Sequence, residues 1–155
     1  KEYENMKDNK EIIIKDVDAI KIISITYKGK YSDCGKYMGK LFKIGGSKIA
    51  GKVFNRYLDE GYEEIAEVEV CLPVKKEISH SDVEYKVLPA CRVISTIHVG
   101  PYDEVGRAYQ RLINYRSKHS LTVNDHSREI YIKGPGMIFR GNPQKYITEV
   151  QMPIE

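Results

Sequence analysis

Residues 93–113 read Val-Ile-Ser-Thr-Ile-His-Val-Gly-Pro-Tyr-Asp-Glu-Val-Gly-Arg-Ala-Tyr-Gln-Arg-Leu-Ile, and this stretch decides the fold. A β-branched run, a Gly-Pro turn and an amphipathic segment follow one another, which predicts a strand, a tight turn and a helix. The same design occurs in residues 22–42 at a constant offset of 71 (93 − 22 = 71), without a gap. The sequence therefore predicts a chain built from two copies of one module.

The offset pairs identical residues along both stretches. These pairs are Ile23 and Ile94, Ser24 and Ser95, Gly29 and Gly100, Tyr31 and Tyr102, Gly35 and Gly106, and Leu41 and Leu112. Gly35 and Gly106 fall in the first turn of the predicted helices, where glycine costs about 1 kcal/mol relative to alanine. A cost kept in both copies indicates close approach by another backbone or by a ligand, or close packing of the helix on a strand.

Apolar side chains recur with helical spacing in each copy. They are Cys34, Tyr37, Met38, Leu41 and Phe42 in copy one, and Val105, Ala108, Tyr109, Leu112 and Ile113 in copy two. Positions i, i+3, i+4, i+7 and i+8 lie on one face of a helix. We therefore predict a first helix that ends at Gly45-Gly46 and a second helix over residues 104–119.

Apolar and β-branched runs predict the strands. The predicted strands span residues 11–15, 19–27, 52–57 and 67–74 in copy one, and 90–99, 128–133 and 146–152 in copy two. Turns are predicted at Asp59-Glu60-Gly61 and Gly134-Pro135-Gly136. Leu72-Pro73-Val74 and Met152-Pro153-Ile154 give both copies the same ending, now at an offset of 80 (152 − 72 = 80).

A length of 155 residues suits a single domain over residues 1–155. Copy one is predicted at about 11–74, a polar connector at 75–87 and copy two at about 88–155. One helix for three strands cannot cover both faces of a sheet. We therefore predict an α+β fold in which tandem pseudo-symmetric β-α-β-β modules form one curved antiparallel sheet. The junction of the copies is the default ligand site.

Composition narrows the class of protein. The net charge of +3 is too small to favour direct nucleic-acid binding, and no apolar run is long enough to span a membrane. Cys34, Cys71 and Cys91 lack disulfide or zinc spacing, and the four histidines form no metal-ligand pattern, so we expect a cytoplasmic protein with no metal and no cofactor. A first residue of Lys1 favours a processed piece or an excised domain.

Tyrosine dominates the aromatic residues, with 12 tyrosines, three phenylalanines and no tryptophan. A tyrosine ring offers an apolar face and a polar tip, which suits the wall of a pocket for flat ligands. It also suits ordinary packing in strands and helices, and composition does not choose between the two interpretations.

Four segments together resemble the GyrI-like small-molecule-binding domain. They are Gly100-Pro101-Tyr102, Leu112-Ile113-Asn114-Tyr115, Arg128-Glu129-Ile130-Tyr131 with Pro135, and Tyr146-Ile147-Thr148-Glu149-Val150-Gln151-Met152-Pro153-Ile154. The family serves as the effector-binding part of bacterial MerR-type and AraC-type multidrug-responsive regulators, and it also exists alone. The resemblance covers nearly the whole chain. It implies a pseudo-twofold fold with a central pocket for hydrophobic, aromatic and often cationic compounds.

The resemblance also implies site residues. A buried glutamate on the penultimate strand corresponds to Glu129, an aromatic at the start of the last strand to Tyr146, and a turn tyrosine of copy one to Tyr31. A second acidic residue of one branch of the family would fall near Gln144, which is neutral. That departure weakens any expectation of strong cation selectivity.

Glu129 alternates with Ile130 and Ile132 along its predicted strand. We expect these isoleucines to face the helices and to leave Glu129 and Tyr131 together on the other face. A carboxylate held among aromatic rings loses hydration, and a cationic ligand compensates by ion pairing and by cation–π contacts. The alternative is a surface glutamate paired with Arg128 or with a nearby lysine.

The remaining candidates are less sharply placed. Tyr102 is the turn tyrosine of copy two, and Phe54 belongs to the core or to the rim of the pocket. Glu149 and Glu69 hold matching places in the two final strands, which favours a shared structural role such as accepting backbone N–H bonds. For Glu149 a ligand-binding role stands equally beside that structural role.

Three hypotheses for function remain open. The first is effector sensing by a domain attached to an N-terminal DNA-binding domain, with a hydrophobic or cationic small molecule as ligand. The second is a stand-alone hydrolase of strained electrophilic toxins, with Glu129 as the base. The third is a protein that sequesters toxins or binds a partner protein. No nucleophile–base pair in the sequence asks for catalysis, so no other catalytic residue is predicted.

Overall fold

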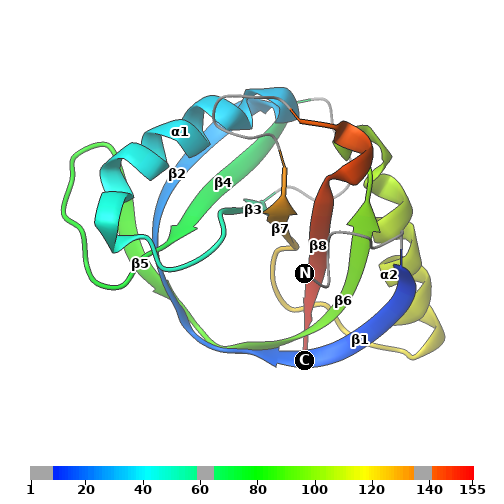
Figure 1. The fold of residues 1–155 in the computed structure, drawn as a ribbon. Helices are drawn as coiled ribbons and strands as arrows, with labels where there is room; N and C mark the ends of the chain where they lie inside the picture. The colour runs from blue at the N-terminus through cyan, green and yellow to red at the C-terminus, as the bar shows by residue number, and fades with distance from the viewer. Residues whose placement is uncertain (1–8, 59–64, 135–140) are drawn as a thin grey trace. The chain divides into compact units, whose positions relative to one another are not determined.

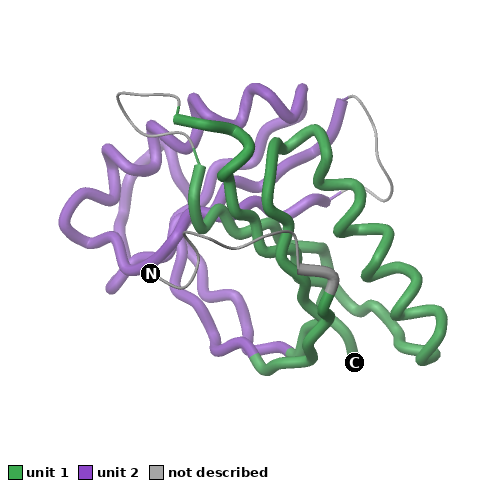
Figure 2. Tube along the Cα trace, turned by 45° about the vertical axis from the view of Figure 1, so that its right-hand side comes forward, with its two compact units in different colours: residues 1–16, 92–155 green, residues 17–91 purple. Residues whose placement is uncertain are grey.

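A computed structural model describes residues 9–58, 65–134 and 141–155 (Figure 1). The chain divides into two compact units (Figure 2). Unit 1 comprises Lys1–Asp16 and Arg92–Glu155, and unit 2 comprises Val17–Cys91. The predicted turn at 59–61, and all of the turn at 134–136 except Gly134, lie outside the described residues.

Unit 2 is an antiparallel sheet with one helix. Its strand order is β3-β4-β2-β5. The strands are β2 (Ile20–Lys30), β3 (Phe54–Tyr57), β4 (Ile65–Pro73) and β5 (Glu84–Leu88). Helix α1 (Cys34–Gly45) follows a 3-10 turn at Tyr31–Asp33, and Gly46 ends it with a φ of 51°. The predicted helix is confirmed. Its glycine stop is confirmed as well, because Gly46 has the positive φ that glycine adopts most readily.

The apolar stripe of α1 packs on one face of this sheet. Leu41 is fully buried, Tyr37 stacks on Tyr27 with ring centroids 4.4 Å apart, and Gly45 lies against Leu72. Burial of a leucine side chain contributes about 1.5–3 kcal/mol. The helical spacing read from the sequence thus fixes which face of the sheet the helix covers.

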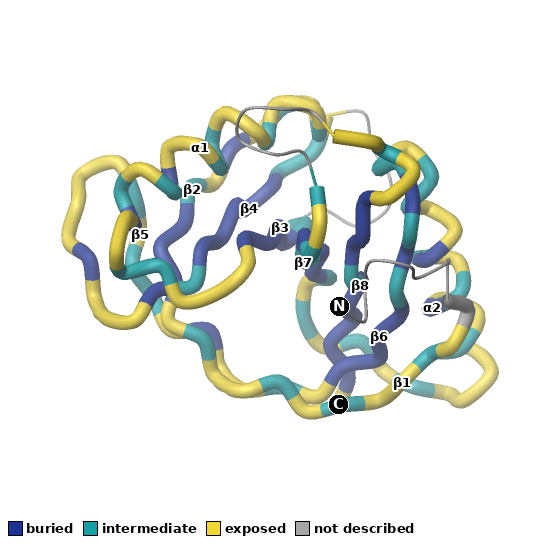
Figure 3. The backbone as a smooth tube through the Cα atoms, in the orientation of Figure 1, coloured by how far each residue is buried: buried dark blue, intermediate teal, exposed yellow. Residues whose placement is uncertain are grey.

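Unit 1 repeats the arrangement with strand order β1-β6-β8-β7. The strands are β1 (Asn9–Val17), β6 (Cys91–Val99), β7 (Arg128–Lys133) and β8 (Ile147–Ile154), and helix α2 spans Gly106–Lys118. Ala108 and Leu112 of α2 are fully buried against Ile94, Val150 and Met152. Figure 3 shows this burial along β8. The α+β class, with antiparallel strands and one main helix in each unit, is confirmed.

The strands of the two units pair in equivalent registers. Ile22 pairs with Pro73 in unit 2, and Val93 pairs with Pro153 in unit 1. The offsets of 71 (93 − 22) and 80 (153 − 73) relate these pairs. The duplication seen in the sequence therefore extends to the pairing of strands, which fixes the side chains on each face.

The leading strand of each copy lies in the sheet of the other copy. β1 begins copy one but neighbours β6 of copy two, while β5 comes just before copy two and pairs with β2 of copy one. β5 lies within residues 75–87 and Leu88, so the predicted connector contains a strand that the sequence analysis did not identify. Its polar composition concealed it, because only its last residue is buried.

The glycines in the first helical turns do not mark a close approach. A Cβ built at Gly35 or Gly106 meets no atom of the described residues within 4 Å. The expectation of close contact at these positions is wrong for the protein itself.

Candidate functional site

In unit 1, the buried carboxylate of Glu129 on β7 accepts hydrogen bonds from two tyrosine hydroxyls. Glu129 is 2% exposed. Tyr131 donates a hydrogen bond to Glu129 Oε1 at 3.0 Å, and Tyr109 of α2 donates to Oε2 at 2.6 Å. Bonds from hydroxyl donors stabilise the charged form of a carboxylate and compensate for its lost hydration.

Two more tyrosine rings extend this group of contacts through Tyr131. The Tyr102 ring meets the Tyr131 ring edge-on at 5.5 Å and stacks on the Tyr146 ring at 5.1 Å, measured between centroids. Tyr131 and Tyr146 are buried. We call Glu129, Tyr102, Tyr109, Tyr131 and Tyr146 the Glu129 cluster. Four of its members were predicted as site residues, and the structure brings these four together.

A tight turn holds Tyr102 and Tyr146 beside each other. Gly100 adopts a φ of 133°, and its N–H donates to the Tyr146 carbonyl at 2.8 Å. The His98 ring nitrogen Nε2 lies 2.9 Å from the Pro101 carbonyl oxygen. These contacts explain why the Gly-Pro-Tyr motif carries a glycine, since other residues rarely adopt such a φ.

The face assigned to Glu129 from the sequence is wrong. Glu129 pairs with Val150, and Val150 belongs to the core cluster under α2. Glu129 and Tyr131 therefore lie on the helix-covered face, and Ile130 points the other way. Alternation along a strand shows which residues share a face but not which face it is. On the helix-covered face, the Tyr109 hydroxyl donates a hydrogen bond that stabilises the buried Glu129 carboxylate.

Tyr109 is the member of the cluster that the sequence analysis did not identify. It was assigned to the apolar stripe of the second helix, and it does pack against the core cluster there. A tyrosine hydroxyl on a buried helix face needs a polar partner. That requirement could have indicated a polar partner for Tyr109 in the sequence. The residue also differs from its match in copy one, Met38, which has no hydroxyl (109 − 38 = 71).

Glu149 lies on the opposite face of β8 from Val150. Its Oε2 accepts hydrogen bonds from Ser95 Oγ at 2.7 Å and Gln151 Nε2 at 2.9 Å, and it lies 2.5 Å from Lys15 Nζ. Burial raises the pKa of Glu149, but hydrogen bonds from Lys15, Gln151 and Ser95 outweigh burial and the net pKa is lowered. The structure does not bring Glu149 into the Glu129 cluster.

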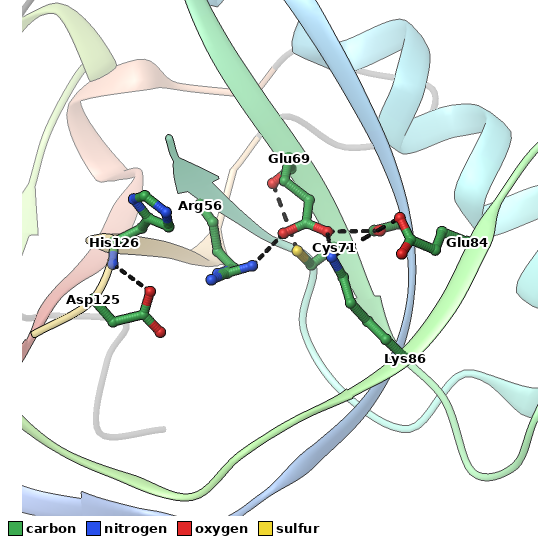
Figure 4. A network of polar contacts seen from close by, with 8 residues as sticks. Arg56, Glu69, Cys71, Glu84, Lys86, Asp125 and His126 are labelled. Carbon is green, nitrogen blue, oxygen red and sulfur yellow. Dashed lines mark hydrogen bonds and ion pairs between the residues drawn. The ribbon is translucent and has the colours of Figure 1, made fainter. Parts of the chain in front are cut away.

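Glu69 occupies the matching place in unit 2 (Figure 4). Ser24 donates to Glu69 Oε2 at 2.9 Å, Lys86 Nζ lies 2.5 Å from the same oxygen, and Arg56 pairs with Oε1. Burial raises the pKa of Glu69, but the bonds from Lys86, Ser24 and Arg56 prevail and lower it. The shared structural role predicted for Glu69 and Glu149 rests on side-chain donors rather than on the N–H groups of a turn.

Tyr31 and Phe54 belong to unit 2. The Tyr31 ring stacks on Tyr57 with centroids 6.0 Å apart. Phe54 is 2% exposed and pairs with Cys71, so it lies on the sheet face opposite Asn55 and Tyr57. Gln144 is exposed in the 3-10 turn Pro143–Lys145, where its backbone N–H donates to Asn142 Oδ1 at 3.1 Å.

An open hollow of about 520 Å³ lies elsewhere on unit 2. Its lining residues are Lys40, Lys43, Ile44, Ile78, His80 and Asp82. Lys40 and Asp82 form an ion pair at 3.3 Å with both side chains half exposed. None of the predicted site residues lines this hollow, and its wide opening to solvent suits a ligand poorly.

The described residues show neither a metal-binding group nor a membrane-spanning helix. Residues 9–58, 65–134 and 141–155 contain no group of three histidine, cysteine, aspartate or glutamate side chains placed to hold a metal ion. Within the same residues, neither helix has the length and apolar character needed to cross a membrane.

Comparison with known families identifies the fold. The model of the GyrI-like small molecule binding domain matches residues 10–155. This chain belongs to the GyrI-like family. The match confirms the resemblance found in the sequence and makes this GyrI-like chain a small-molecule-binding domain. No curated protein sequence matches it.

Solved structures share the GyrI-like fold. The C-terminal domain of EcmrR superposes with a TM-score of 0.82 at 24% identity, covering 94% of this chain and 97% of that domain. EcmrR in its complex with DNA gives 0.83 at 23% identity, and the match covers 94% of this chain but 57% of the EcmrR chain.

Two further solved structures are less similar to this chain. SAV2435 bound to tetraphenylphosphonium gives a TM-score of 0.65 at 13% identity, with 94% of each chain covered. A hydrolase from Listeria innocua gives 0.69 at 14% identity and covers 96% of this chain and 93% of its own. At these identities the superpositions show a common fold.

Proposed function

We propose that this domain binds hydrophobic, aromatic and cationic small molecules and serves as the effector-sensing domain of a transcriptional regulator. The Glu129 cluster is the observation that carries the proposal. It combines one buried carboxylate with four tyrosines, two of which donate hydrogen bonds to it. A lipophilic cation pairs with the acid and stacks against the rings, where each cation–π contact contributes about 0.5–2 kcal/mol.

The relatives support this choice of ligand and context. SAV2435 binds tetraphenylphosphonium, a lipophilic aromatic cation. EcmrR carries a domain of the same fold as part of a longer chain in a complex with DNA. We infer that this domain is likewise joined to an N-terminal DNA-binding domain, which the sequence of the intact gene product tests directly.

Titration with tetraphenylphosphonium tests the role of Glu129. Glu129→Gln keeps the shape and the tyrosine cluster but removes the charge, so we expect the affinity for this cation to fall about tenfold, equivalent to 1.4 kcal/mol. Glu149→Gln is the matched control, because Glu149 is a partly buried glutamate that lies on the other sheet face. Equal affinities for wild type and Glu129→Gln would reject the proposal.

A hydrolase is the second candidate, favoured by the Listeria innocua relative. Here Glu129 accepts a proton from water as the water oxygen bonds to a strained electrophilic carbon. The ring bond at that carbon breaks, and its electron pair takes up a proton, which Glu129 returns. Both oxygens of Glu129 already accept tyrosine hydroxyl bonds, so an attacking water would compete with these donors. Conversion of a cyclopropane-containing electrophile that Glu129→Gln abolishes would establish this activity, and binding without turnover would exclude it. Capture of a stoichiometric protein partner would instead favour sequestration or partner binding.

A further inference from the structure

β1 is an edge strand whose centre is apolar on both faces. It stands first in the strand order and has β6 as its one neighbour among the described residues. Ile13 and Ile14 are 46% and 47% exposed, and they point to opposite faces because side chains alternate along a strand. An edge strand of nine residues with exposed isoleucines is a template for pairing with another strand.

The strand at the other end of the order, β5, is protected against such pairing. It has five residues, and the Glu84 carboxylate and the Lys86 ammonium lie on it 4.0 Å apart. Short edge strands that carry charges pair poorly with foreign strands. Glu84 is the match of Ile13 in copy two (84 − 13 = 71). The apolar edge is therefore a property of copy one alone.

The backbone of β1 directs hydrogen-bonding groups to its outer edge. Thr96 Oγ1 of β6 donates to the Glu11 carbonyl at 2.9 Å, so this carbonyl faces β6. Backbone groups of successive residues point alternately to the two sides of a strand. Those of Ile13 therefore face β6, and those of Ile12 and Ile14 face outward, where they can form the ladder of an added strand.

The sequence of β1 is complementary to itself in the antiparallel direction. Residues 10–16 read Lys-Glu-Ile-Ile-Ile-Lys-Asp. Charges at equal distances from Ile13 are opposite in sign, and the three central residues are isoleucines. Opposite charges and β-branched side chains directly across a ladder favour pairing. An antiparallel copy with Ile13 opposite Ile13 gives these further pairs: Glu11 with Lys15 and Ile12 with Ile14 (11 + 15 = 26 and 12 + 14 = 26).

This register is distinguished from its neighbours. It sets the outward backbone groups of Ile12 against those of Ile14, as a ladder requires. A shift by one residue would set outward groups against groups that face β6. A shift by two residues sets Ile13 against Glu11 or against Lys15, and the charge pairs are lost (11 + 13 = 24 and 13 + 15 = 28).

We propose that β1 is a homodimer interface, where it pairs antiparallel with β1 of a second copy about a twofold axis at Ile13. The pairing joins the unit 1 sheets of the two copies into one continuous sheet. Ile12 already packs against the core cluster under α2, so its pairing with the partner's Ile14 extends that apolar surface. A twofold contact uses the same strand of both copies, so it closes and leaves no β1 edge exposed.

Lys15 serves both the fold and the interface. Its ammonium binds Glu149 within unit 1, and its side chain remains 37% exposed. An ammonium has three hydrogen-bond donors, so Lys15 can also bind the partner's Glu11, which lies directly across the ladder.

Charges at the twofold axis test the register. Ile13→Lys places two ammonium groups opposite each other, so the dissociation constant of the dimer should rise about tenfold in sedimentation equilibrium. Ile13→Glu should weaken the dimer equally. An equimolar mixture of the two variants should restore it, because lysine then faces glutamate. Val87→Lys is the matched control: Val87 is 52% exposed on the edge strand β5, and this variant should dimerise like wild type.

Cross-linking covers the case in which the charged variants do not fold. Ile13→Cys places two thiols across the axis, where the Cα atoms of such a pair lie about 4.5 Å apart and within reach of a disulfide. Mild oxidation should give a covalent dimer on a non-reducing gel, above the background of wild type with its three native cysteines. Ile14→Cys is the control, because this position faces Ile12 of the partner and not itself.

The results that would overturn the proposal are distinct. A wild-type chain that stays monomeric up to millimolar concentration would exclude the interface. A dimer that Val87→Lys dissociates, or assembly into open chains, would place the contact on β5. Equal cross-linking of Ile13→Cys and Ile14→Cys, or a mixture of Ile13→Lys and Ile13→Glu that stays monomeric, would reject the twofold axis at Ile13.

Discussion

Lys15 Nζ lies 2.5 Å from Glu149 Oε2, so an ion pair joins the leading strand of copy one to the final strand of copy two. Lys86 and Glu69 repeat this pair in unit 2 at 2.5 Å. The same offsets of 71 (86 − 15) and 80 (149 − 69) relate the two pairs. In each pair, a lysine on the leading strand of one copy binds a glutamate in the sheet of the other copy. The same glutamate also accepts a hydrogen bond from a serine hydroxyl.

The two ion pairs should differ in what their loss costs. Arg56 also pairs with Glu69, whereas the other donors to Glu149 are the neutral Ser95 and Gln151. Among the described residues, Lys15→Met leaves the partly buried Glu149 carboxylate with neutral donors, and it should lower the free energy of unfolding by about 1–3 kcal/mol. Lys86→Met should lower it by less than about 1 kcal/mol, because Arg56 remains. Urea unfolding of both variants measures the difference.

Hydrogen exchange localises the same effect. In Lys15→Met the amides of β1 should exchange faster, while those of β5 keep their wild-type protection. Equal destabilisation by the two methionine variants would show that the arginine does not substitute for the lysine.

Acid should weaken unit 2 through Glu69. Its pKa is lowered in the folded protein, so its contribution to stability is complete above the unfolded value of about 4.3 and is lost as the pH falls through the lower folded value. The difference in unfolding free energy between wild type and Glu69→Gln should therefore be constant above about pH 5 and shrink below pH 4. Urea unfolding at several pH values measures it.

Glu84→Gln is the control for this pH dependence. Glu84 is an exposed glutamate whose carboxylate lies 4.0 Å from the same Lys86 ammonium. We expect its stability profile to follow that of wild type. A Glu69→Gln profile parallel to wild type from pH 7 to pH 2 would contradict the role of the buried carboxylate.

The helices and most strands follow from local patterns in the sequence. The stripe around Leu41 and Leu112 has helical spacing, and a glycine stop at Gly46 limits the first helix. Both features act within a few residues, so the sequence displays them directly. The identity of β5 was hidden because its residues pair at the edge of a sheet and only Leu88 is buried.

Tertiary contacts decided the parts of the site that local patterns could not. Glu129 and Tyr131 were correctly placed on one face, but the choice of that face depended on the Tyr109 hydroxyl, which comes from a distant element. Glu149 looked equally suited to binding and to structure. Its partner Lys15 lies 134 residues earlier (149 − 15 = 134) on an exchanged strand, which periodicity does not predict.

Alanine at the first-turn glycines should stabilise the protein. Gly35 and Gly106 are helical positions where an added Cβ meets open space among the described residues. Gly35→Ala and Gly106→Ala should each raise the free energy of unfolding by about 0.4–1 kcal/mol, because alanine loses less backbone entropy on folding. Thermal unfolding measures the gain. Gly45→Ala is the opposing control, since its Cβ would lie 2.9 Å from Leu72 and should destabilise.

Removing the Tyr109 hydroxyl should affect stability and affinity in opposite directions. Tyr109→Phe keeps the ring packed on the core but takes a 2.6 Å hydrogen bond from the buried Glu129 carboxylate. The unliganded protein should lose about 1–3 kcal/mol of stability, because one carboxylate oxygen loses a donor. A bound cation then restores more, so the affinity for tetraphenylphosphonium should rise severalfold. Urea unfolding and titration of the same preparation give both quantities, and a fall in affinity together with stability would show that Tyr109 contacts the ligand itself.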